Sequence, residues 1–217
     1  MPARSPMSVR LPVRTLLDAL LSGDQPAADK VAADALTLLG SRVAVFSDLI
    51  QPAQYEIGEL WYAGRIGVAD EHRATAIVEK VVRALPPTPS KTPIPAGNRC
   101  VLAALGEERH VLGLRLFELA LQDDGWTTRP LGGEASLDSV IREVKVRPAR
   151  MVALTAAFLP SAQPVQSAIT AIKTTGAKVL VGGPAFNRVP DLWVRVGADG
   201  HGSDARVGVV LARRMAR

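Results

Sequence analysis

A histidine that follows a glutamate by two residues is the feature of this sequence best suited to bind a metal or a cofactor. Glu108, Arg109 and His110 form the pattern, and Gly113 follows three residues after the histidine. A carboxylate can hold one ring nitrogen of a histidine in place, which leaves the other nitrogen available to a metal. Because a short match of this kind also occurs in many solvent-exposed turns, its interpretation depends on the segments around it.

The histidine is placed by two segments of different periodicity. Residues 99–105 form an apolar run typical of a strand, and residues 111–120 have the apolar spacing of a helix. In open α/β sheets, ligands bind beyond the carboxyl ends of the strands, where each strand turns into the next helix. His110 is therefore predicted to lie at the ligand-binding edge of such a sheet.

Further connections that follow predicted strands carry small and polar residues. Glycines allow the backbone to come close to a ligand, and free backbone N–H groups favour a phosphate. A single Gly-Gly pair is more typical of a tight turn, but several pairs at one sheet edge predict a long ligand lying across it. The segments are Gly132-Gly133-Glu134, residues 154–158 around Thr155, Gly182-Gly183-Pro184, and residues 197–205 with Gly200 and His201.

Two kinds of periodicity divide the chain. Residues 13–85 show helical spacing in four segments with short connections, which predicts a four-helix bundle. Pro52 is expected to kink the third helix or to mark its first turn after a break. Residues 86–98 contain five prolines and are predicted to be an extended linker and a hinge. The four helical segments are residues 15–23, 27–39, 43–63 and 68–85.

Residues 99–217 alternate between short apolar strands and helices. This alternation predicts a Rossmann-like (flavodoxin-like) α/β domain, with a parallel sheet covered by helices on both faces. Residues 1–12 are expected to be a flexible lead-in. The predicted strands are residues 100–105, 126–131, 151–156 and 178–181 with a brief edge strand, and the predicted helices are residues 111–122, 136–146, 162–175, 190–196 and 205–215.

The composition is that of an ordinary globular protein, with 217 residues, 47% of them hydrophobic and 22% charged. No apolar run reaches the roughly 18–20 residues of a membrane span, and no signal peptide is recognisable. The single cysteine, Cys100, excludes an internal disulfide and agrees with a cytoplasmic protein. The net charge of +5 permits weak attraction to nucleic acid, but no DNA-binding motif is visible, so we do not expect this chain to bind DNA by itself.

From residue 98 onwards the chain resembles the cobalamin-binding domain shared by corrinoid enzymes and sensors. That family has the motif D-x-H-x-x-G, a serine or threonine near the end of the third strand, and a Gly-Gly pair after the fourth. The resemblance implies that His110 is the lower axial ligand of cobalt, with Arg109 and Gly113 in the same motif. Glu108 stands where the family has aspartate; it keeps the carboxylate, and we expect it to orient His110 with a shifted ring or a bridging water.

By the same resemblance, other residues surround the nucleotide tail of the cofactor. Thr155, Gly182 and Gly183 match the positions around the buried tail, and Gly200 and His201 match the final loop. The implied binding mode is base-off and His-on: the histidine displaces the benzimidazole of the cofactor, which enters a cleft between sheet and helix. Small residues suit that cleft, and they include Ala103, Gly106 and Ala156.

The helical half resembles the cap of light-sensing, adenosylcobalamin-dependent regulators. Trp61, Glu71 and His72 form the pattern W-x9-E-H. The resemblance implies that Trp61 covers the adenosyl group and that Glu71 and His72 contact it or its photolysis product, with the cofactor held between the cap and the sheet domain. Considered alone, the three residues would suit a core tryptophan and a polar surface pair. With His110 and His201, all three histidines of the chain then fall on motif positions.

Two departures from those regulators affect the expected output. No DNA-binding winged-helix domain is recognisable in this chain. Tyr62 follows the tryptophan, where such repressors often have a histidine that binds cobalt after illumination, so a bis-histidine photoproduct through that position is not expected. Free-standing members of the group, the photocobilins, hold a bilin beside cobalamin. Biliverdin is therefore an open second chromophore here, although no residue requires it.

Three functions are consistent with these residues. The favoured hypothesis is a cobalamin-binding light sensor, not an enzyme, in which loss of the adenosyl group changes self-association or the contacts of an effector protein. The second is a corrinoid carrier of a methyltransferase system, although carriers typically cap the cofactor with bulky apolar residues. The third is an interaction module that kept the fold without the cofactor. The output partner, the oligomeric states in light and dark and the upper axial ligand stay open.

Overall fold

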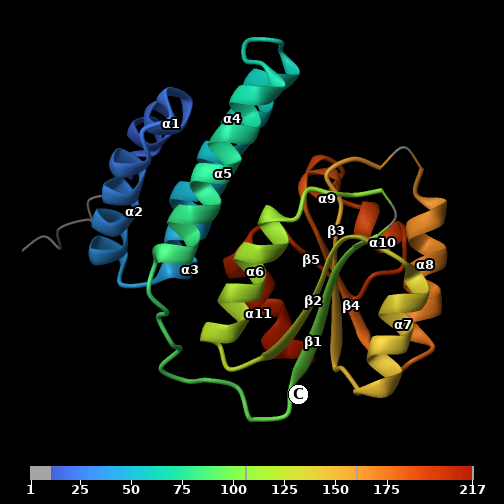
Figure 1. Cartoon of the computed structure of the whole chain (residues 1–217). Coiled ribbons are helices and arrows are strands. Elements are labelled where there is room, and N and C mark those ends of the chain that lie inside the picture. Colours follow the sequence, from blue (N-terminus) through green and yellow to red (C-terminus); the bar gives the residue numbers. More distant parts are fainter. Residues whose placement is uncertain (1–10, 106, 160, 217) are drawn as a thin grey trace, which may run out of the picture. The chain divides into compact units, whose positions relative to one another are not determined.

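The computed structural model describes residues 11–105, 107–159 and 161–216 of the chain. Two compact units make it up, Met1–Leu85 and Pro86–Arg217 (Figure 1). The flexible lead-in predicted for residues 1–12 lies mostly outside the described residues, as does Gly106. In the part of the chain that is described, no helix combines the length and the apolar character needed to cross a membrane.

From residue 11 onwards, the regular structure of the first unit consists only of helices. Leu16, Leu20, Phe46 and Ile57 are among its fully buried side chains, because α1 contacts α2, α4 and α5 while α2 contacts α3 and α5. The predicted helical bundle is thus confirmed. Its elements are α1 Val13–Ser22, α2 Gln25–Leu39, α3 Arg42–Val45, the π-helix η1 Phe46–Ile50, α4 Gln51–Tyr62 and α5 Val68–Ala84.

Pro52 lies in the first turn of α4, and a π-helical turn rather than a break precedes it. In that turn the N–H of Gln51 donates to the carbonyl of Phe46, five residues back. A proline has no N–H to donate and its ring crowds the preceding turn. The wider π turn is a regular way for a helix to take up such an irregularity, so the backbone stays helical from Arg42 to Tyr62.

The second unit is a five-stranded parallel sheet with the strand order β2-β1-β3-β4-β5. This is the flavodoxin-like order, in which the chain reverses direction across the sheet between β1 and β3. The predicted Rossmann-like fold is confirmed. Its elements are β1 Arg99–Leu105, α6 Leu112–Asp123, β2 Thr127–Ala135, α7 Leu137–Val146, β3 Met151–Thr155, α8 Gln163–Lys173, β4 Lys178–Gly182, α9 Pro184–Arg188, α10 Leu192–Arg195, β5 Gly200–Gly202 and α11 Ala205–Met215.

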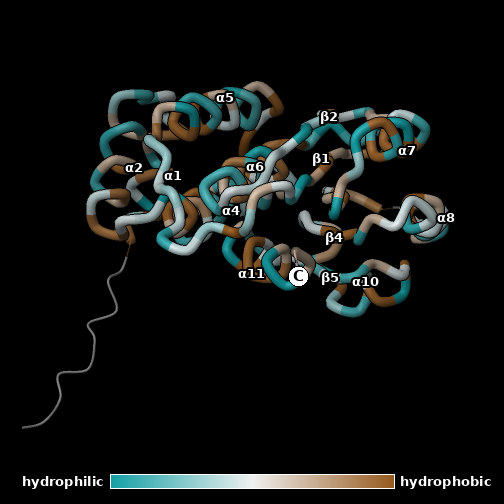
Figure 2. Tube along the Cα trace, turned by 90° about the horizontal axis from the view of Figure 1, so that it is seen from below, coloured by the Kyte–Doolittle hydropathy of each residue, from teal (hydrophilic) through white to brown (hydrophobic). Residues whose placement is uncertain are grey.

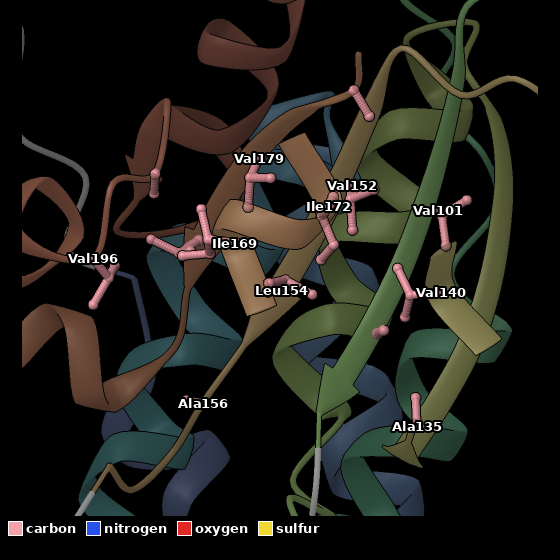
Figure 3. Close-up of a cluster of buried hydrophobic side chains, with 14 of the residues drawn as sticks. Val101, Ala135, Val140, Val152, Leu154, Ala156, Ile169, Ile172, Val179 and Val196 are labelled. Carbon is pink, nitrogen blue, oxygen red and sulfur yellow. The ribbon is translucent and has the colours of Figure 1, made fainter. Parts of the chain in front are cut away.

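Helices cover both faces of the sheet, so the central strands are apolar at successive positions. Val101 faces one cluster and its neighbour Cys100 the other, because side chains alternate along a strand. β2, at the edge, is the exception: it is largely hydrophilic (Figure 2). The first face packs Val101, Val152 and Val179 against Val140 of α7 and Ile169 and Ile172 of α8 (Figure 3). The second packs Cys100, Leu102, Met151 and Leu180 against Leu114, Phe117 and Leu121 of α6 and Ala212 of α11.

Two predicted boundaries in this unit are wrong. Gly132, Gly133 and Glu134 were expected after the second strand but lie within β2, which continues to Ala135 through two register irregularities against β1. Gly200 and His201 were expected in a loop but belong to β5, the brief edge strand, which pairs with β4. The short helix α9 after Gly183 was not predicted.

The proline-rich linker is fastened to the α/β unit. The N–H of Thr88 donates to the Asp123 carboxylate at 3.2 Å, and the N–H of Ser90 donates to the Asp123 carbonyl at 2.7 Å. Arg213 of α11 donates to the Ser90 hydroxyl at 2.7 Å and forms an ion pair with the buried Asp124. The whole segment was expected to act as a hinge, but these contacts restrict its motion from Thr88 onwards.

Asp199, which immediately precedes β5, is hydrogen-bonded to β4, and this contact allows a prediction about the free energy of unfolding. Its carboxylate accepts from the N–H of Val179 at 2.8 Å and from Lys173 Nζ at 3.1 Å. Burial raises the pKa of Asp199, but the Val179 N–H, Lys173 and Lys178 together lower it below its ordinary value. We expect Asp199→Asn to reduce the free energy of unfolding by about 1–2 kcal/mol at pH 7, because a hydrogen bond to a charged group is lost.

The pH dependence of this loss has a defined sign. A carboxyl group with a folded-state pKa below its unfolded value stabilises the protein above the unfolded pKa, and that stabilisation is lost as the pH falls through the folded pKa. The difference between wild type and Asp199→Asn in urea denaturation should be constant from pH 8 to about pH 5 and shrink below about pH 4. Asp34→Asn, which removes only an exposed pair with Lys30, is the control, with an expected change below about 0.5 kcal/mol. Equal effects of both variants would contradict the prediction.

Candidate functional site

The candidate site lies where the chain reverses direction across the sheet. β1 and β3 are neighbours in the sheet, and Ala104 of β1 is paired with Thr155 at the end of β3. The connection that follows β1 carries Glu108, Arg109 and His110, and the connection that follows β3 begins at Ala156. Glu108 and Ala157, which are 49 residues apart in the sequence, are thereby brought together, as happens at the ligand-binding edge of flavodoxin-like sheets.

Glu108 joins these two loops and holds the histidine. Its Oε1 lies 2.6 Å from Nδ1 of His110 and accepts from the His110 N–H at 2.8 Å. Its Oε2 accepts from the N–H of Ala157 at 2.6 Å. The glutamate therefore reaches the ring directly, and the bridging water considered from the sequence is not needed.

The charge of Glu108 determines which ring nitrogen of His110 can act as a ligand. Burial raises the pKa of Glu108, but the hydrogen bonds from Ala157 and His110 outweigh it, so the pKa lies below its ordinary value. An ionised Glu108 favours a proton on Nδ1, which leaves a lone pair on Nε2. The His110 side chain is 72% exposed while that of Glu108 is only 11% exposed. A fixed carboxylate thus presents a solvent-accessible imidazole.

The donor set suits a metal that brings its other ligands with it. Among the described residues there is no group of three or more His, Cys, Asp or Glu side chains that could hold a bare ion. One imidazole with its second nitrogen fixed can serve as an axial ligand of a metal that a macrocycle already holds. Gly113, in the first turn of α6, would find no heavy atom within 4 Å of an added Cβ, so the space beside it is open.

Arg109 is held against the edge of the sheet. Its Nε and Nη2 donate to Glu134 Oε1 at 2.9 and 2.7 Å. The Glu134 N–H donates to the Glu108 carbonyl at 2.9 Å, so this residue of β2 contacts the loop twice. Hydrogen bonding and the charge of Glu134 raise the pKa of Arg109. The guanidinium that the sequence offered as a cofactor contact is thus engaged in an ion pair.

Thr155, Gly182 and Gly183 come together at the ends of β3 and β4. Thr155 is paired with Gly182, and the Ala156 N–H donates to the Gly182 carbonyl at 3.2 Å. Gly183 has φ 96° and ψ 169°, and an added Cβ would lie 2.5 Å from the Ala156 carbonyl oxygen and 2.7 Å from Thr155 Oγ1. These three predicted residues therefore form one close-packed edge beside the histidine loop.

Gly200 and His201 lie on the outer strand β5, farther along the same sheet. Nε2 of His201 is 2.7 Å from Oδ1 of Asn187 in α9, and the ring lies tilted against that of Phe186 at 6.3 Å between centroids. Burial lowers the pKa of His201. His201 therefore has a structural partner in Asn187, a residue that the sequence did not single out.

Trp61, Glu71 and His72 lie at one end of the α4–α5 pair in the helical unit. Trp61 is in the last turn of α4 and the other two are in the first turns of α5, on either side of a five-residue turn. Trp61 is 46% exposed, which excludes the alternative of a core tryptophan. Glu71 accepts from the Thr75 hydroxyl at 2.9 Å and lies 3.6 Å from Nε2 of His72. The three predicted residues thus lie at the same end of this helix pair, with Glu71 and His72 next to each other.

Two contacts in the site had no signal or only a weak one in the sequence. Ala157 contributes a backbone N–H, which any residue except proline provides. Glu134 follows a Gly-Gly pair, which favours a turn but is also compatible with an irregular strand end.

Comparison with known proteins agrees with this geometry. Two family models match, both described as B12 binding domains, one over residues 13–85 and the other over residues 98–210. The HTH-type transcriptional repressor CarH of Myxococcus xanthus is 29% identical to the chain over 175 residues. Those residues are 79% of this chain and 57% of the repressor, so the chain spans little more than half the length of that relative.

Solved structures show the same fold. The monomethylamine corrinoid protein of Methanosarcina barkeri aligns with a TM-score of 0.74 and 18% identity, over 92% of this chain and 95% of that one. A cobalamin-binding protein from Desulfitobacterium hafniense aligns with a TM-score of 0.50 and 22% identity, over 94% of this chain and 98% of that one. At these identities the likeness establishes the fold, a helical unit followed by a Rossmann-like unit.

Proposed function

This chain belongs to the B12 binding domain family and binds cobalamin, and from that premise we propose that it is a light sensor that uses adenosylcobalamin. In the proposal His110 is the lower ligand of cobalt. The contact between Glu108 and Nδ1 of His110 supports this assignment, since it leaves Nε2 as the coordinating nitrogen. The observation that supports the light-sensing part is the position of the half-exposed Trp61 at the same end of the α4–α5 pair as Glu71 and His72.

Each residue has a defined role in this proposal. Glu108 keeps the proton of His110 on Nδ1 and holds the ring, while the edge formed by Thr155, Gly182 and Gly183 accommodates the nucleotide tail. Trp61 covers the adenosyl group and excludes water from it. When bound, adenosylcobalamin supplies a cobalt–carbon bond that light breaks. Glu71 and His72, which lie 3.6 Å apart, contact the adenosyl group or its photolysis product.

The proposed output is a change of assembly rather than a chemical conversion of a substrate. A two-state change that is biased by a ligand requires different contacts of that ligand in the two states, and loss of the adenosyl group beneath Trp61 provides such a difference. The result is altered self-association or altered contact with an effector protein. Biliverdin is proposed only as an additional chromophore, which a parallel reconstitution would reveal by its own absorption band.

The proposal is tested by reconstitution with adenosylcobalamin in the dark, followed by absorption spectra before and after green light. A light sensor should bind the cofactor, show a base-off, His-on spectrum and keep a lasting spectral change after illumination. Size-exclusion chromatography in the dark and after light measures the change of assembly. Photolysis that leaves the elution volume unchanged would overturn the light-driven change of assembly and favour the corrinoid carrier, which should then accept methylcobalamin.

Trp61→Ala separates the cap from the lower ligand. The variant should keep the His-on spectrum, because Trp61 and His110 belong to different structural units. It should differ from wild type in the rate of photolysis and in the photoproduct spectrum, since the adenosyl group has lost its cover. Leu38→Ala, which shortens an exposed apolar side chain of α2 outside the proposed cap, is the control and should photolyse as wild type does. Wild-type photolysis in Trp61→Ala would contradict the assignment of the cap.

A further inference from the structure

We infer that Glu134 is a positioning residue for cobalamin binding, which it supports by fixing the loop that carries His110. The inference rests on the proposed role of His110 as the lower ligand. Glu134 belongs to β2, a different element from the histidine loop, and it does not lie in the motif that links Glu108, His110 and Gly113. It contacts the loop at two places, the Glu108 carbonyl and the Arg109 side chain.

The backbone of Glu134 adopts a conformation that L residues rarely take. Its φ of 55° is the only positive value among the non-glycine residues that the structure describes. Left-handed conformations are unfavourable for residues with a Cβ and persist where surrounding contacts require them. Here the conformation directs the Glu134 N–H to the Glu108 carbonyl at 2.9 Å. The left-handed backbone of Glu134 therefore makes a direct hydrogen bond to the histidine loop.

The side chain of Glu134 makes the second contact. One carboxylate oxygen, Oε1, accepts from both Nε and Nη2 of Arg109, at 2.9 and 2.7 Å. Both side chains are exposed, and an exposed ion pair contributes little to global stability. A pair whose two hydrogen bonds fix a guanidinium can nevertheless restrict a loop locally, since Arg109 immediately precedes His110. Its effect is thus expected in the geometry of the ligand rather than in the stability of the fold.

The end of β2 is shaped for this approach. Its pairing with β1 passes from Ala103↔Gly132 to Leu105↔Ala135, so three steps on β2 match two on β1. Such an irregularity re-aims side chains at the end of a strand. At Gly133 an added Cβ would lie 2.9 Å from the Glu108 carbonyl oxygen and 3.2 Å from the Arg109 Cα. The strand and the loop are therefore in backbone contact, and Gly133 permits it.

Displacement of the loop would be transmitted to the histidine. Glu108 is anchored at its carbonyl by Glu134 and at its carboxylate by Ala157, and the same carboxylate holds Nδ1 of His110. Loss of the Glu134 carboxylate frees Arg109, the neighbour of both Glu108 and His110, so that the backbone contact at the Glu108 carbonyl alone holds this side of the loop. The imidazole should then sample more orientations, which reduces the fraction that can bind cobalt.

The test is a titration of full-length variants with adenosylcobalamin in the dark, with absorption spectra recorded at saturation. Glu134→Ala should weaken binding by about threefold to tenfold and increase the fraction of bound cofactor without histidine on cobalt. Its melting temperature without cofactor should match that of wild type. Glu134→Gln, which keeps a neutral acceptor, should recover most of the affinity, an effect that a purely structural role would not produce.

Arg109→Ala and the double variant isolate the pair. If the two residues act as one unit, the double variant should bind about as well as either single variant, because non-additivity marks residues that share an interaction. Asp34→Ala, which breaks the exposed Lys30–Asp34 pair of α2, is the matched control and should bind as wild type does. Wild-type affinity and a wild-type spectrum in Glu134→Ala would overturn the inference alone. A wild-type protein that binds cobalamin without histidine coordination would overturn the proposed lower ligand as well.

Discussion

Gly183→Ala is expected to destabilise the α/β unit by about 3 kcal/mol or more, because two costs act at the same position. The backbone of Gly183, at φ 96° and ψ 169°, lies in a region that essentially only glycine occupies. In addition, the new Cβ would meet the Ala156 carbonyl oxygen at 2.5 Å and Thr155 Oγ1 at 2.7 Å. Backbone cannot rotate away as a flexible side chain would, so β3 and β4 would have to separate at their ends.

Gly176→Ala is the matched control for this prediction. Gly176 also has a positive φ, 85°, but an added Cβ would find no heavy atom within 4 Å. Only the conformational cost remains, which is about 1 kcal/mol. Urea denaturation followed by circular dichroism measures both variants. Equal destabilisation by the two substitutions would show that the close approach to Ala156 is not a real constraint.

Gly183→Ala should also disturb the loop that holds His110. Ala156 is followed by Ala157, whose N–H donates to the Glu108 carboxylate. A shift at Ala156 therefore reaches the group that orients His110, although Gly183 and His110 lie on connections of different strands. The effect on cobalamin binding should exceed that of Gly176→Ala even at temperatures where both variants are folded.

The elements that the sequence predicted well are those with a local chemical signal. The last helix, Ala205–Met215, was predicted with its observed bounds, and the Asp204 side chain accepts from the Val207 N–H as an N-cap should. The proline-rich segment was correctly placed outside both helices and strands. In each case residue type alone determines what the backbone can do, so no tertiary contact was needed for the prediction.

The errors occurred where tertiary contacts decide the conformation. Gly132 and Gly133 suit a turn or an irregular strand equally well, and pairing with β1 selects the strand. The linker composition indicates an extended chain but does not show that Arg213, more than 100 residues later, holds Ser90. Likewise, the pattern from Glu108 to His110 predicted the carboxylate–histidine contact, whereas the third partner, the N–H of Ala157, depends on the β1–β3 pairing.

His110→Ala is expected to have the largest effect on cobalamin binding. The variant should bind the cofactor about 10- to 100-fold more weakly and should lose the His-on spectrum entirely. Its stability without cofactor should change by no more than about 0.5 kcal/mol, because the side chain is mostly exposed. Titration with adenosylcobalamin in the dark and thermal unfolding of the apoprotein measure the two quantities. A His-on spectrum in this variant would show that another residue binds cobalt.

Glu108→Gln should affect both the cobalamin affinity and the stability of the apoprotein, and this distinguishes Glu108 from His110. The glutamine oxygen can replace Oε1, which accepts from His110, or Oε2, which accepts from Ala157, but the –NH2 group at the other position can only donate. Because Glu108 is nearly buried, a backbone N–H left without its partner should lower the free energy of unfolding by about 1–3 kcal/mol. The cofactor should bind with intermediate affinity and a partly His-on spectrum, since the imidazole is present but no longer oriented. A variant that loses stability but keeps the full His-on spectrum would show that Glu108 joins the two loops without controlling the ligand.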